Sequence, residues 1–288
     1  MKHKSSPSLI KWTGSKRSQA EVISQFFPIN AQNYYEPFLG SGAVLYYATQ
    51  HFKKTFGSDI YEPLIEIWNG VKDQPQQVID VYTDSWQKLQ SNFPDFFYTI
   101  RDRFNKKKNG NDLLFLSRTC VNGIIRFNSD GDFNNSLHLS RRGMIPSRFA
   151  NTVWQWTMRL KNTEFSVADY SEVIKKAQKG DFVYLDPPYA NSHNRYIDDL
   201  DIDRFISFLK ELNNAGILWA LSFDGARGGD NLTYNLPDDI YEFHTFISSG
   251  NSAVQKVLND SVEQVQESLY LNFTPSINKN KQGELQFR

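Results

Sequence analysis

The sequence predicts an α/β fold interrupted by an inserted segment of different character. Two stretches, residues 33–70 and 181–223, each combine apolar strands, turns and a periodic helix. Between them, residues 71–160 show weak periodicity and hold most of the excess positive charge. A chain of 288 residues has room for two small domains, or for one α/β domain that carries an insertion.

The composition predicts a packed globular protein of the cytoplasm. Hydrophobic residues make up 40% of the chain and aromatic residues 15%. No apolar run approaches the roughly 18 residues of a membrane span, and the N-terminus lacks a signal-peptide hydrophobic region, so we expect no membrane partner. The only cysteine is Cys120, and no Cys/His cluster has zinc spacing, so neither an intrachain disulfide nor a metal is expected.

The first α/β stretch predicts a ligand-binding turn. A short strand around Tyr34 and Tyr35 leads into a turn containing Gly40 and Gly42, and a helix begins near Val44. Glycines let the backbone approach a ligand closely, and a helix N-terminus offers unpaired N–H groups. Such turns serve many nucleotides as well as packing, so the turn indicates a ligand without naming it.

The next strand, residues 55–58, ends at Asp59 and is followed by a helical pattern through Leu64, Ile65 and Trp68. An acidic residue about twenty positions after a glycine turn is what a nucleotide-binding βαβ unit uses to bind ribose hydroxyls. The spacing therefore predicts that Asp59 holds a ribose.

The second α/β stretch places Asp186-Pro187-Pro188-Tyr189 directly after a buried strand, residues 182–185. A periodic helix follows over residues 201–215, with acidic residues in its first turn and Gly216 as its stop, and then another strand over residues 217–223. Open α/β sheets bind ligands at the carboxyl ends of their strands. That position favours a functional segment over a merely rigid proline turn.

The inserted segment has a charge of its own. The chain has zero formal net charge, yet residues 101–162 hold twelve basic and four acidic residues. Turn signals such as Asn122-Gly123 and Asp130-Gly131 break its periodicity. The charge indicates a face that meets polyanions, although a solvated charged face would show the same imbalance.

The Asp-Pro-Pro-Tyr segment fits methylation of an exocyclic amine. The adenine N6 lone pair is delocalised into the ring, so its methylation needs acceptors that draw on the N–H hydrogens. Asp186 supplies one acceptor and the Pro187 carbonyl a second, and the two prolines stiffen the loop so that both converge. Tyr189 offers a flat face on which a flipped base can stack.

Five motifs in order resemble the Dam-type DNA adenine-N6 methyltransferases. The resemblance spans about residues 8–273, and its motifs are the runs 11–16, 36–44, 118–128 and 186–189 together with Asp59. It implies a Rossmann-like domain that binds S-adenosylmethionine on a mixed sheet, and a mainly helical target-recognition domain bearing a β-hairpin. The implied division is residues 1–70 and 161–288 for the catalytic domain and 71–160 for the insertion.

The resemblance also implies which residues bind the cofactor. Trp12 and Lys16 would lie near its methionine part, Asp59 would hold the ribose, and Asp186 would serve both cofactor and catalysis. The full implied set is Trp12, Lys16, Glu36, Phe38, Gly40, Gly42, Asp59, Asp169, Tyr170 and Asp186. Alternatives stay open at three positions: Trp12 also fits a core or lid aromatic, Lys16 a solvated lysine, and Asp169 an N-cap, alone or in addition.

DNA contacts are expected from the inserted segment. Arginine suits guanine and asparagine suits adenine in bidentate contacts, and similarity places this stretch at double-stranded DNA. The expected contact residues are Arg118, Asn122, Arg126, Asn128, Arg141 and Arg142. Arg126 also fits an internal salt bridge, Asn122 a turn before Gly123, and the last two arginines phosphate rather than bases.

The chain departs from its relatives at residues 133–144. Members that read GATC follow the Arg-Phe-Asn run with a Phe-Asn-Val-Pro-Phe-Gly-like sequence, which is absent here. We therefore expect a target other than plain GATC.

The leading hypothesis is a site-specific DNA adenine-N6 methyltransferase, either paired with a restriction endonuclease or solitary, and acting as a monomer or weak dimer. An alternative is a catalytically silent DNA-binding regulator that kept the fold. A nicotinamide dehydrogenase is disfavoured because the third glycine of its fingerprint is absent. A cytosine-C5 enzyme needs a nucleophilic cysteine, and Cys120 sits among residues that look like packing.

Overall fold

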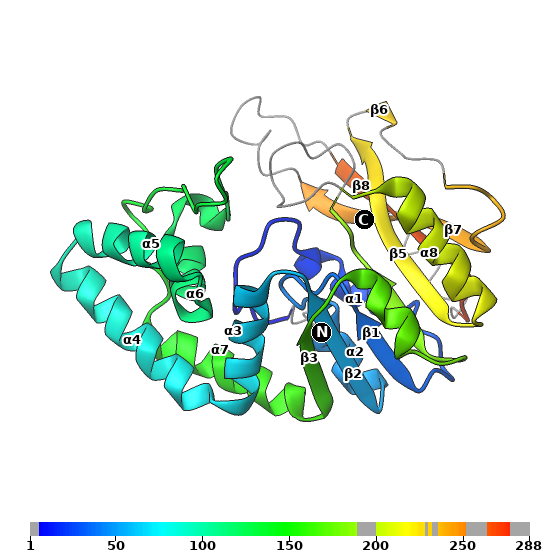
Figure 1. The fold of residues 1–288 in the computed structure, drawn as a ribbon, viewed down its shortest axis with the longest axis horizontal. Coiled ribbons are helices and arrows are strands. Elements are labelled where there is room, and N and C mark those ends of the chain that lie inside the picture. The colour runs from blue at the N-terminus through cyan, green and yellow to red at the C-terminus, as the bar shows by residue number, and fades with distance from the viewer. Residues whose placement is uncertain (1–5, 189–199, 228–229, 232–235, 252–263, 277–288) are drawn as a thin grey trace.

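A mixed β-sheet forms the centre of the molecule. The computed structural model describes residues 6–188, 200–227, 230–231, 236–251 and 264–276. The strands are β1 (Asn33–Glu36), β2 (Lys54–Asp59), β3 (Thr163–Val167), β4 (Phe182–Leu185), β5 (Leu218–Arg227), β6 (Asp230–Asn231), β7 (Phe243–Asn251) and β8 (Gln264–Leu271). They lie in the order β3-β2-β1-β4-β5-β8-β7, with β6 paired to β5 (Figure 1).

The strand order creates a switch point in the middle of the sheet. The first five strands of that order are parallel, whereas β8 runs antiparallel to both β5 and β7. From β1 the chain moves outward to β2 and β3, then returns to place β4 on the other side of β1. Ligands of such Rossmann-like sheets bind outside the carboxyl ends of the strands at this reversal. The topology therefore confirms the predicted fold class.

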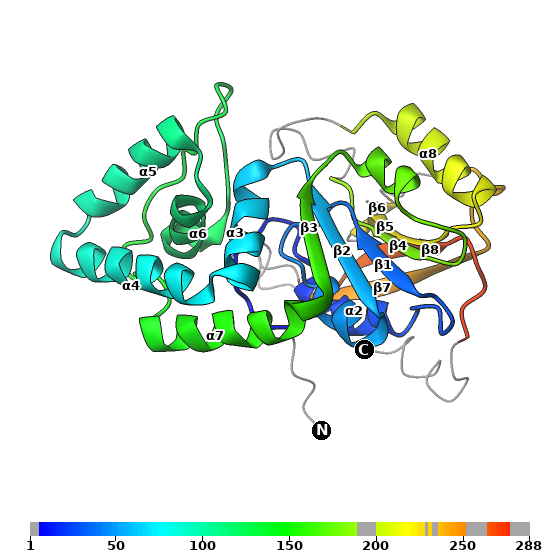
Figure 2. The ribbon, with the colours of Figure 1, turned by 60° about the horizontal axis from the view of Figure 1, so that its bottom comes forward.

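Helices cover both faces of the sheet, as Figure 2 shows for α2 and α8. Alternate strand residues enter different cores. Tyr34 and Phe182 belong to the core under α1 (Ala20–Ser24), α2 (Leu45–His51) and α3 (Glu62–Asp73). Their neighbours Tyr35 and Val183 belong to the core under α8 (Ile202–Asn214). Because side chains of a strand alternate between its faces, continuous apolar runs such as residues 182–185 are buried on both.

A block of helices connects β2 to β3. After α3 come α4 (Pro75–Ser91), α5 (Asp95–Lys107), α6 (Gly110–Thr119) and α7 (Pro146–Arg159), which lie beside the sheet in Figure 1. The weak periodicity of residues 71–160 had predicted no individual helix here. Residues 120–137 fold back on themselves through two isolated antiparallel bridges, Cys120–Leu137 and Phe127–Phe133. The helical segment shares one core with the sheet helices, and its division into a separate domain stays a prediction.

The elements predicted in the two α/β stretches are confirmed. The strands before the glycine turn, before Asp59 and before Asp186 are β1, β2 and β4. The helix predicted over residues 201–215 is α8, with Asp201 as its N-cap and Gly216 in the left-handed conformation that ends it. No helix in the described part of the chain is long and apolar enough to cross a membrane.

Candidate active site

A cavity of about 460 Å³ opens at the carboxyl ends of β1, β2 and β4. It gathers most of the residues predicted to bind a cofactor: Trp12, Lys16, Glu36, Phe38, Gly40, Asp59, Asp169, Tyr170 and Asp186 line it. Pro187 and Pro188 line it as well, whereas Tyr189 lies outside the described residues. Segments far apart in sequence meet here because parallel strands end at one edge of the sheet.

The glycine turn is held by two tryptophans. Gly40 and Gly42 adopt φ values of +47° and +62°, which side-chain-bearing residues rarely take. A β-carbon at Gly40 would lie 2.9 Å from the Trp12 ring, and one at Gly42 would lie 3.0 Å from the Trp68 ring. Trp68 also donates its indole N–H to the Gly40 carbonyl at 3.2 Å. Gly40 lines the cavity and Gly42 supports the turn from behind.

Asp59 lies at the end of β2, with its carboxylate tied to the glycine turn. One oxygen accepts the backbone N–H of Gly40 at 3.2 Å, and the other accepts that of Tyr61 at 3.1 Å. Burial raises the pKa of Asp59 to about 6, although these N–H donors partly offset the effect. A carboxylate offers about four lone pairs, so Asp59 keeps acceptor capacity for a ligand hydroxyl beside these backbone donors.

An aromatic platform lies beside Asp59. The rings of Phe38 and Tyr170 stack with centroids 5.2 Å apart. Asp169 precedes Tyr170 and caps the 3₁₀ turn η4 (Tyr170–Lys175) by accepting the Ser171 N–H at 3.0 Å. The predicted N-cap role of Asp169 is therefore confirmed, and the residue lines the cavity as well.

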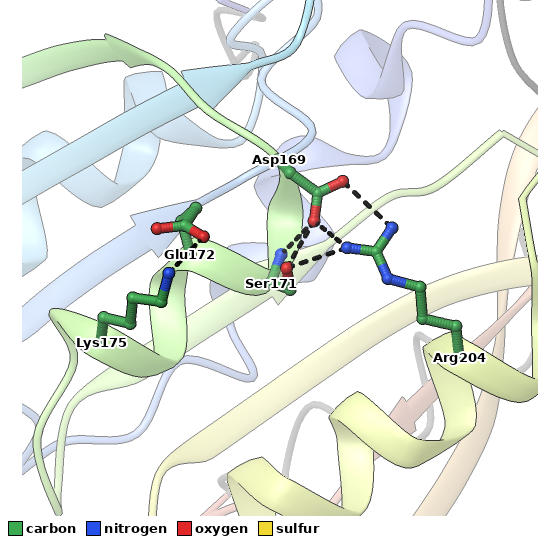
Figure 3. A network of polar contacts seen from close by, with 5 residues as sticks. All are labelled: Asp169, Ser171, Glu172, Lys175 and Arg204. Atoms are coloured by element: carbon green, nitrogen blue, oxygen red, sulfur yellow. Dashed lines mark hydrogen bonds and ion pairs between the residues drawn. The ribbon is translucent and has the colours of Figure 1, made fainter.

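Arg204 of α8 also lines the cavity, and Figure 3 shows its guanidinium group turned toward Asp169 and Ser171. Its guanidinium group donates to Asp169 at 2.6 Å and to the Ser171 hydroxyl at 3.0 Å. Burial acts to raise the pKa of Asp169, but the hydrogen bonds from Ser171 and Arg204 outweigh burial and lower it. Asp169 is therefore ionised, and its orientation is held by donors from the backbone and side chain of Ser171 and from Arg204.

Asp186 follows directly after β4, lines the same cavity and is paired with Lys16. The Lys16 Nζ is 2.6 Å from the Asp186 Oδ1 and also donates to the Gly14 carbonyl at 3.3 Å. The Lys16 side chain is only 3% exposed, so it is not a solvated lysine. Burial raises the pKa of Asp186 to about 6; the Lys16 charge acts to lower it and the Glu267 charge to raise it.

A second buried carboxyl group, Glu36, lies near Asp186. Glu36 is 3% exposed and accepts a hydrogen bond from the Tyr34 hydroxyl at 2.5 Å. Burial raises the pKa of Glu36 to about 8, the Tyr34 hydrogen bond acts to lower it, and Asp186 raises it further. Near neutral pH, Glu36 is therefore mostly protonated and adds little negative charge beside Asp186.

Replacing Glu36 with glutamine is expected to flatten the pH dependence of stability between about pH 6 and 8. A folded-state pKa of about 8, above the ordinary 4.5, means that Glu36 contributes stability that is complete at low pH. That contribution is lost as pH rises, by about 2 kcal/mol over these two pH units. Asp59 and Asp186 have pKa values of about 6, so the pH dependence of stability that they contribute lies mainly below pH 6.

Urea unfolding of the cofactor-free protein at a series of pH values measures this slope. The matched control is Glu62→Gln, which removes an exposed carboxylate at the start of α3. Equal slopes between pH 6 and 8 in Glu36→Gln and in the unaltered protein would contradict the burial argument.

In the segment after α6, alternate side chains of residues 125–128 line the cavity. Ile125 is buried and Phe127 half-buried, and both line the cavity, whereas Arg126 and Asn128 between and beyond them are exposed. Phe127 meets Tyr61 edge-to-face, with centroids 5.7 Å apart. An extended chain sends successive side chains to opposite sides. The alternation of residues 125–128 therefore places the two apolar side chains in the cavity wall and the two polar side chains on the outer surface.

The other predicted DNA-contact residues occupy different environments. Arg118 is mostly withdrawn from solvent and donates to the Ser8 carbonyl at 3.1 Å, so it holds the N-terminal segment in place. Asn122 is exposed in a left-handed conformation, φ 57°, as its turn interpretation predicted. Arg141 and Arg142 are exposed, and the Arg142 guanidinium lies 4.1 Å from the centroid of the Phe93 ring.

Arg126 and Asn128 are arranged by local hydrogen bonds. The Arg126 side chain donates to the Asn134 side chain at 2.9 Å, across the fold-back of residues 120–137. The Asn128 side chain accepts the backbone N–H groups of Asp130 and Asp132 at 3.0 and 2.8 Å, closing the turn. Arg126 keeps donors free in this arrangement because its guanidinium has five N–H groups.

The surroundings of Cys120 do not activate its thiol. The residue is 3% exposed, and burial raises the pKa of its thiol to about 11. The thiolate needed for nucleophilic attack is therefore scarce near neutral pH. This agrees with the expectation that Cys120 is a packing residue.

Several cavity residues escaped sequence reasoning. Tyr61, Ile125, Phe127 and Arg204 line the cavity, and Glu267 of β8 lies 3.6 Å from the Lys16 ammonium group. The alternation of residues 125–128 was readable in the sequence. Arg204 and Glu267 gave no local signal, because only the packing of α8 against β5 and η4 and the pairing of β8 with β5 bring them to the site.

Comparison with known proteins points to one family. The family model described as D12 class N6 adenine-specific DNA methyltransferase matches residues 12–245. The Type II methyltransferase M.MjaIII of Methanocaldococcus jannaschii is 31% identical over 240 residues, which is 74% of this chain and 82% of that protein. The Type II methyltransferase M1.LlaDCHI of Lactococcus lactis subsp. cremoris is 27% identical over 62% of this chain and 64% of its own length. The DNA adenine methylase of Vibrio cholerae is 29% identical over 63% and 64%.

Proposed function

Because the chain belongs to the D12 class of N6 adenine-specific DNA methyltransferases, we propose that Asp186, Pro187, Pro188 and Tyr189 form its catalytic centre. The protein is a DNA methyltransferase that acts on adenine N6 and uses S-adenosylmethionine. The observation that carries the proposal is the position of Asp186 at the end of β4, in the wall of the cavity and at the switch point of the sheet.

The cavity fits a nucleoside-containing cofactor. Its volume lies within the usual range of small-ligand sites, roughly 300–1,000 Å³. Asp59 has acceptor capacity for ribose hydroxyls, and the Phe38–Tyr170 stack supplies an apolar surface for a purine. The hydroxyls of Tyr61 and Tyr170 are buried without a hydrogen-bond partner among the described residues. Such groups are normally satisfied, so these hydroxyls favour a polar ligand in the cavity.

We assign cofactor binding to Trp12, Lys16, Glu36, Phe38, Gly40, Gly42, Asp59, Asp169, Tyr170 and Asp186. Bound S-adenosylmethionine supplies an electrophilic methyl group on a positively charged sulfur. Asp59 would hold the ribose end and the Lys16–Asp186 pair the opposite end. Gly42 acts by keeping the turn that carries Gly40 in shape.

The residues of the catalytic centre act on the target amine. The Asp186 carboxylate accepts one N6 hydrogen, and the Pro187 carbonyl accepts the other, so that nitrogen electron density becomes available for bond formation. The amine then loses a proton, for which the Asp186 carboxylate is the nearest proposed acceptor. Asp186 must be ionised to accept that hydrogen, so methylation is expected to weaken below about pH 6, the pKa of Asp186.

Residues 71–160 are proposed as the DNA-recognition segment. Support comes from the excess of basic residues in this region and from the outward side chains of Arg126 and Asn128 on the loop whose Ile125 and Phe127 face the cavity. Asn122, Arg141 and Arg142 are exposed on the same segment. We propose Arg126 as a base-reading residue and Arg118 as a support of the N-terminal segment rather than a direct contact.

The target is proposed to differ from plain GATC, because residues 133–144 differ from the run expected for that target. We also propose that the enzyme works as a monomer or weak dimer, with a restriction endonuclease of the same specificity or alone. The names of two relatives, both Type II methyltransferases, support the paired arrangement.

The test is to express the protein in a host without adenine methylation and to map N6-methyladenine by single-molecule sequencing. A modified adenine in one short motif other than GATC is expected. Absence of N6-methyladenine from every DNA tried would overturn the catalytic assignment, and methylation of GATC alone would overturn the proposed target.

The variant Arg126→Ala is expected to weaken discrimination between the target and single-base variants by about 1–3 kcal/mol, because a bidentate base contact is worth that much. Single-turnover rates on duplexes that differ at one base pair measure the effect. Arg101→Ala, which removes a positive charge from α5, is the matched control and should leave the rate ratios unchanged. Equal ratios in Arg126→Ala and the unaltered enzyme would show that Arg126 only packs against Asn134.

A further inference from the structure

The Lys16 ammonium group is close to two carboxylates that come from different strands of the sheet, β4 and β8, with β5 between them. Asp186 follows β4 and lies 2.6 Å away, and Glu267 lies on β8 at 3.6 Å. The first distance is that of a short charge-assisted hydrogen bond, whereas the second is that of an ion pair without a hydrogen bond. Lys16 is therefore shared unequally, with Asp186 as the closer partner.

Glu267 is part of this cluster without being part of the cavity wall. Its side chain is 18% exposed, as is that of Asp186, but only Asp186 is among the residues that line the cavity. The Glu267 Oε2 is buried and accepts no hydrogen bond from the described residues. A buried, unsatisfied carboxylate oxygen is costly, and the Lys16 charge is what compensates Glu267 here.

The sharing of Lys16 between Asp186 and Glu267 matters because Lys16 and the target amine compete for the Asp186 carboxylate. Its Oδ1 is taken up by Lys16, yet the proposed catalysis requires the same carboxylate to accept a hydrogen from the target amine. A lysine held by Asp186 alone would bind that carboxylate more tightly. The Glu267 charge attracts the same ammonium group and reduces its hold on Asp186.

We propose that Glu267 is a positioning residue for Asp186, which acts through Lys16 and keeps the Asp186 carboxylate available to the target amine. The proposal rests on the catalytic role proposed for Asp186 above. In the proposed role, Glu267 contacts no reacting atom.

The charged and titratable groups around Asp186 support the expected direction of its pKa change when Glu267 is replaced. Lys16 from η1 (Lys16–Ser18) lowers the pKa of Asp186, and Glu267 from β8 raises it. Glu36 and Tyr34 from β1 and Tyr184 from β4 also interact electrostatically with Asp186. Removing the Glu267 charge leaves the Lys16 attraction unopposed by that residue, so the pKa of Asp186 should fall.

The variant Glu267→Gln tests this with two measurements. In single-turnover methylation, the acid limb of the pH–rate profile should move down by about one pH unit, and the plateau rate should fall by about tenfold. A residue that only stabilised the fold would lower the rate without moving the acid limb. Glu242→Gln, an exposed site near the start of β7, is the matched control and should move neither.

The second measurement needs neither cofactor nor DNA. Carbon-13 NMR of protein labelled at aspartate carboxyls follows the Asp186 titration, with the resonance assigned by its loss in Asp186→Asn. The midpoint should be about one pH unit lower in Glu267→Gln. In Glu267→Asp, which keeps the charge but shortens the side chain, it should lie between the two.

Unchanged Asp186 midpoints in both Glu267 variants would overturn the inference. If Glu267→Gln does not fold, the Glu267→Asp midpoint alone decides, since a value equal to that of the unaltered protein is incompatible with the proposed coupling. Failure of the function proposed above looks different, because the unaltered enzyme would then produce no N6-methyladenine, whatever the Asp186 midpoint does.

Discussion

Replacement of Asp186 by asparagine is expected to lower the rate of adenine methylation by about a thousandfold or more. Asparagine keeps the size of the side chain but removes its negative charge, and with it the strong acceptor for the N6 hydrogen and the acceptor for the departing proton. Positioned acid–base groups and charge-stabilising contacts each contribute roughly 10²–10⁴-fold to a rate. The amide also offers N–H groups to the target amine, which is the wrong polarity for that contact.

Single-turnover assays with a radiolabelled methyl donor and an excess of enzyme measure this loss at the chemical step. Asp203→Asn, an exposed aspartate in the first turn of α8, is the control and should keep the normal rate. Thermal unfolding and cofactor titration of Asp186→Asn should show that the protein still folds. A rate within tenfold of the unaltered enzyme would mean that Asp186 is not the acceptor.

The second large effect is expected at Asp59. Its replacement by alanine should weaken S-adenosylmethionine binding by about a hundredfold, because hydrogen bonds to a charged group are worth roughly 1.5–3 kcal/mol and a ribose offers two hydroxyls. The substitution also leaves the N–H groups of Gly40 and Tyr61 without their acceptor, so the glycine turn itself should loosen.

Calorimetric titration with S-adenosylmethionine and with its demethylated product separates these contributions. Asp59→Asn retains an acceptor oxygen for one backbone N–H and should fall between alanine and the unaltered protein. Asp73→Ala, an exposed aspartate at the end of α3, is the control. Because both ligands carry the same ribose hydroxyls, both should lose affinity by similar factors. Unchanged affinity in Asp59→Ala would remove the ribose assignment.

The two carboxylates have similar pKa values but different neighbours, which fits the different tasks proposed for them. Burial raises the pKa of both Asp59 and Asp186 to about 6. Asp59 is compensated by neutral backbone donors, which orient it as an acceptor for a neutral ligand group. Asp186 is compensated by the Lys16 charge, which varies with the position of the ammonium group and therefore with Glu267.

The functional elements that were predictable from sequence are those set by local chemistry. Gly40, Asp59 and Asp186 each follow a short apolar strand, and the strand ends of a parallel sheet converge, so their meeting in one cavity followed from pattern alone. The left-handed φ of Asn122 and the capping by Asp169 and Asp201 were equally local, since they depend on a few neighbouring residues.

Helices α4 to α7 were not predictable in the same way. Residues 71–160 form four helices whose apolar faces pack in several directions, so the hydrophobic period is diluted. The environment of Arg118 was likewise not predictable from the sequence. Its residue type and motif suggested a DNA contact, whereas its burial against Ser8 depends on the path of the N-terminal segment.

The sequence by itself determined the α/β class and the family resemblance, and it suggested the chemistry proposed for Asp186, because strand periodicity and motif spacing are local properties of the chain. The tertiary structure alone decided what surrounds that carboxylate. Lys16, Glu36 and Glu267 interact with Asp186 from η1, β1 and β8. Burial and the Glu267 charge raise the pKa of Asp186, and the Lys16 charge acts to lower it. Burial and long-range charge pairing depend on the packed arrangement of distant segments, which no stretch of sequence contains.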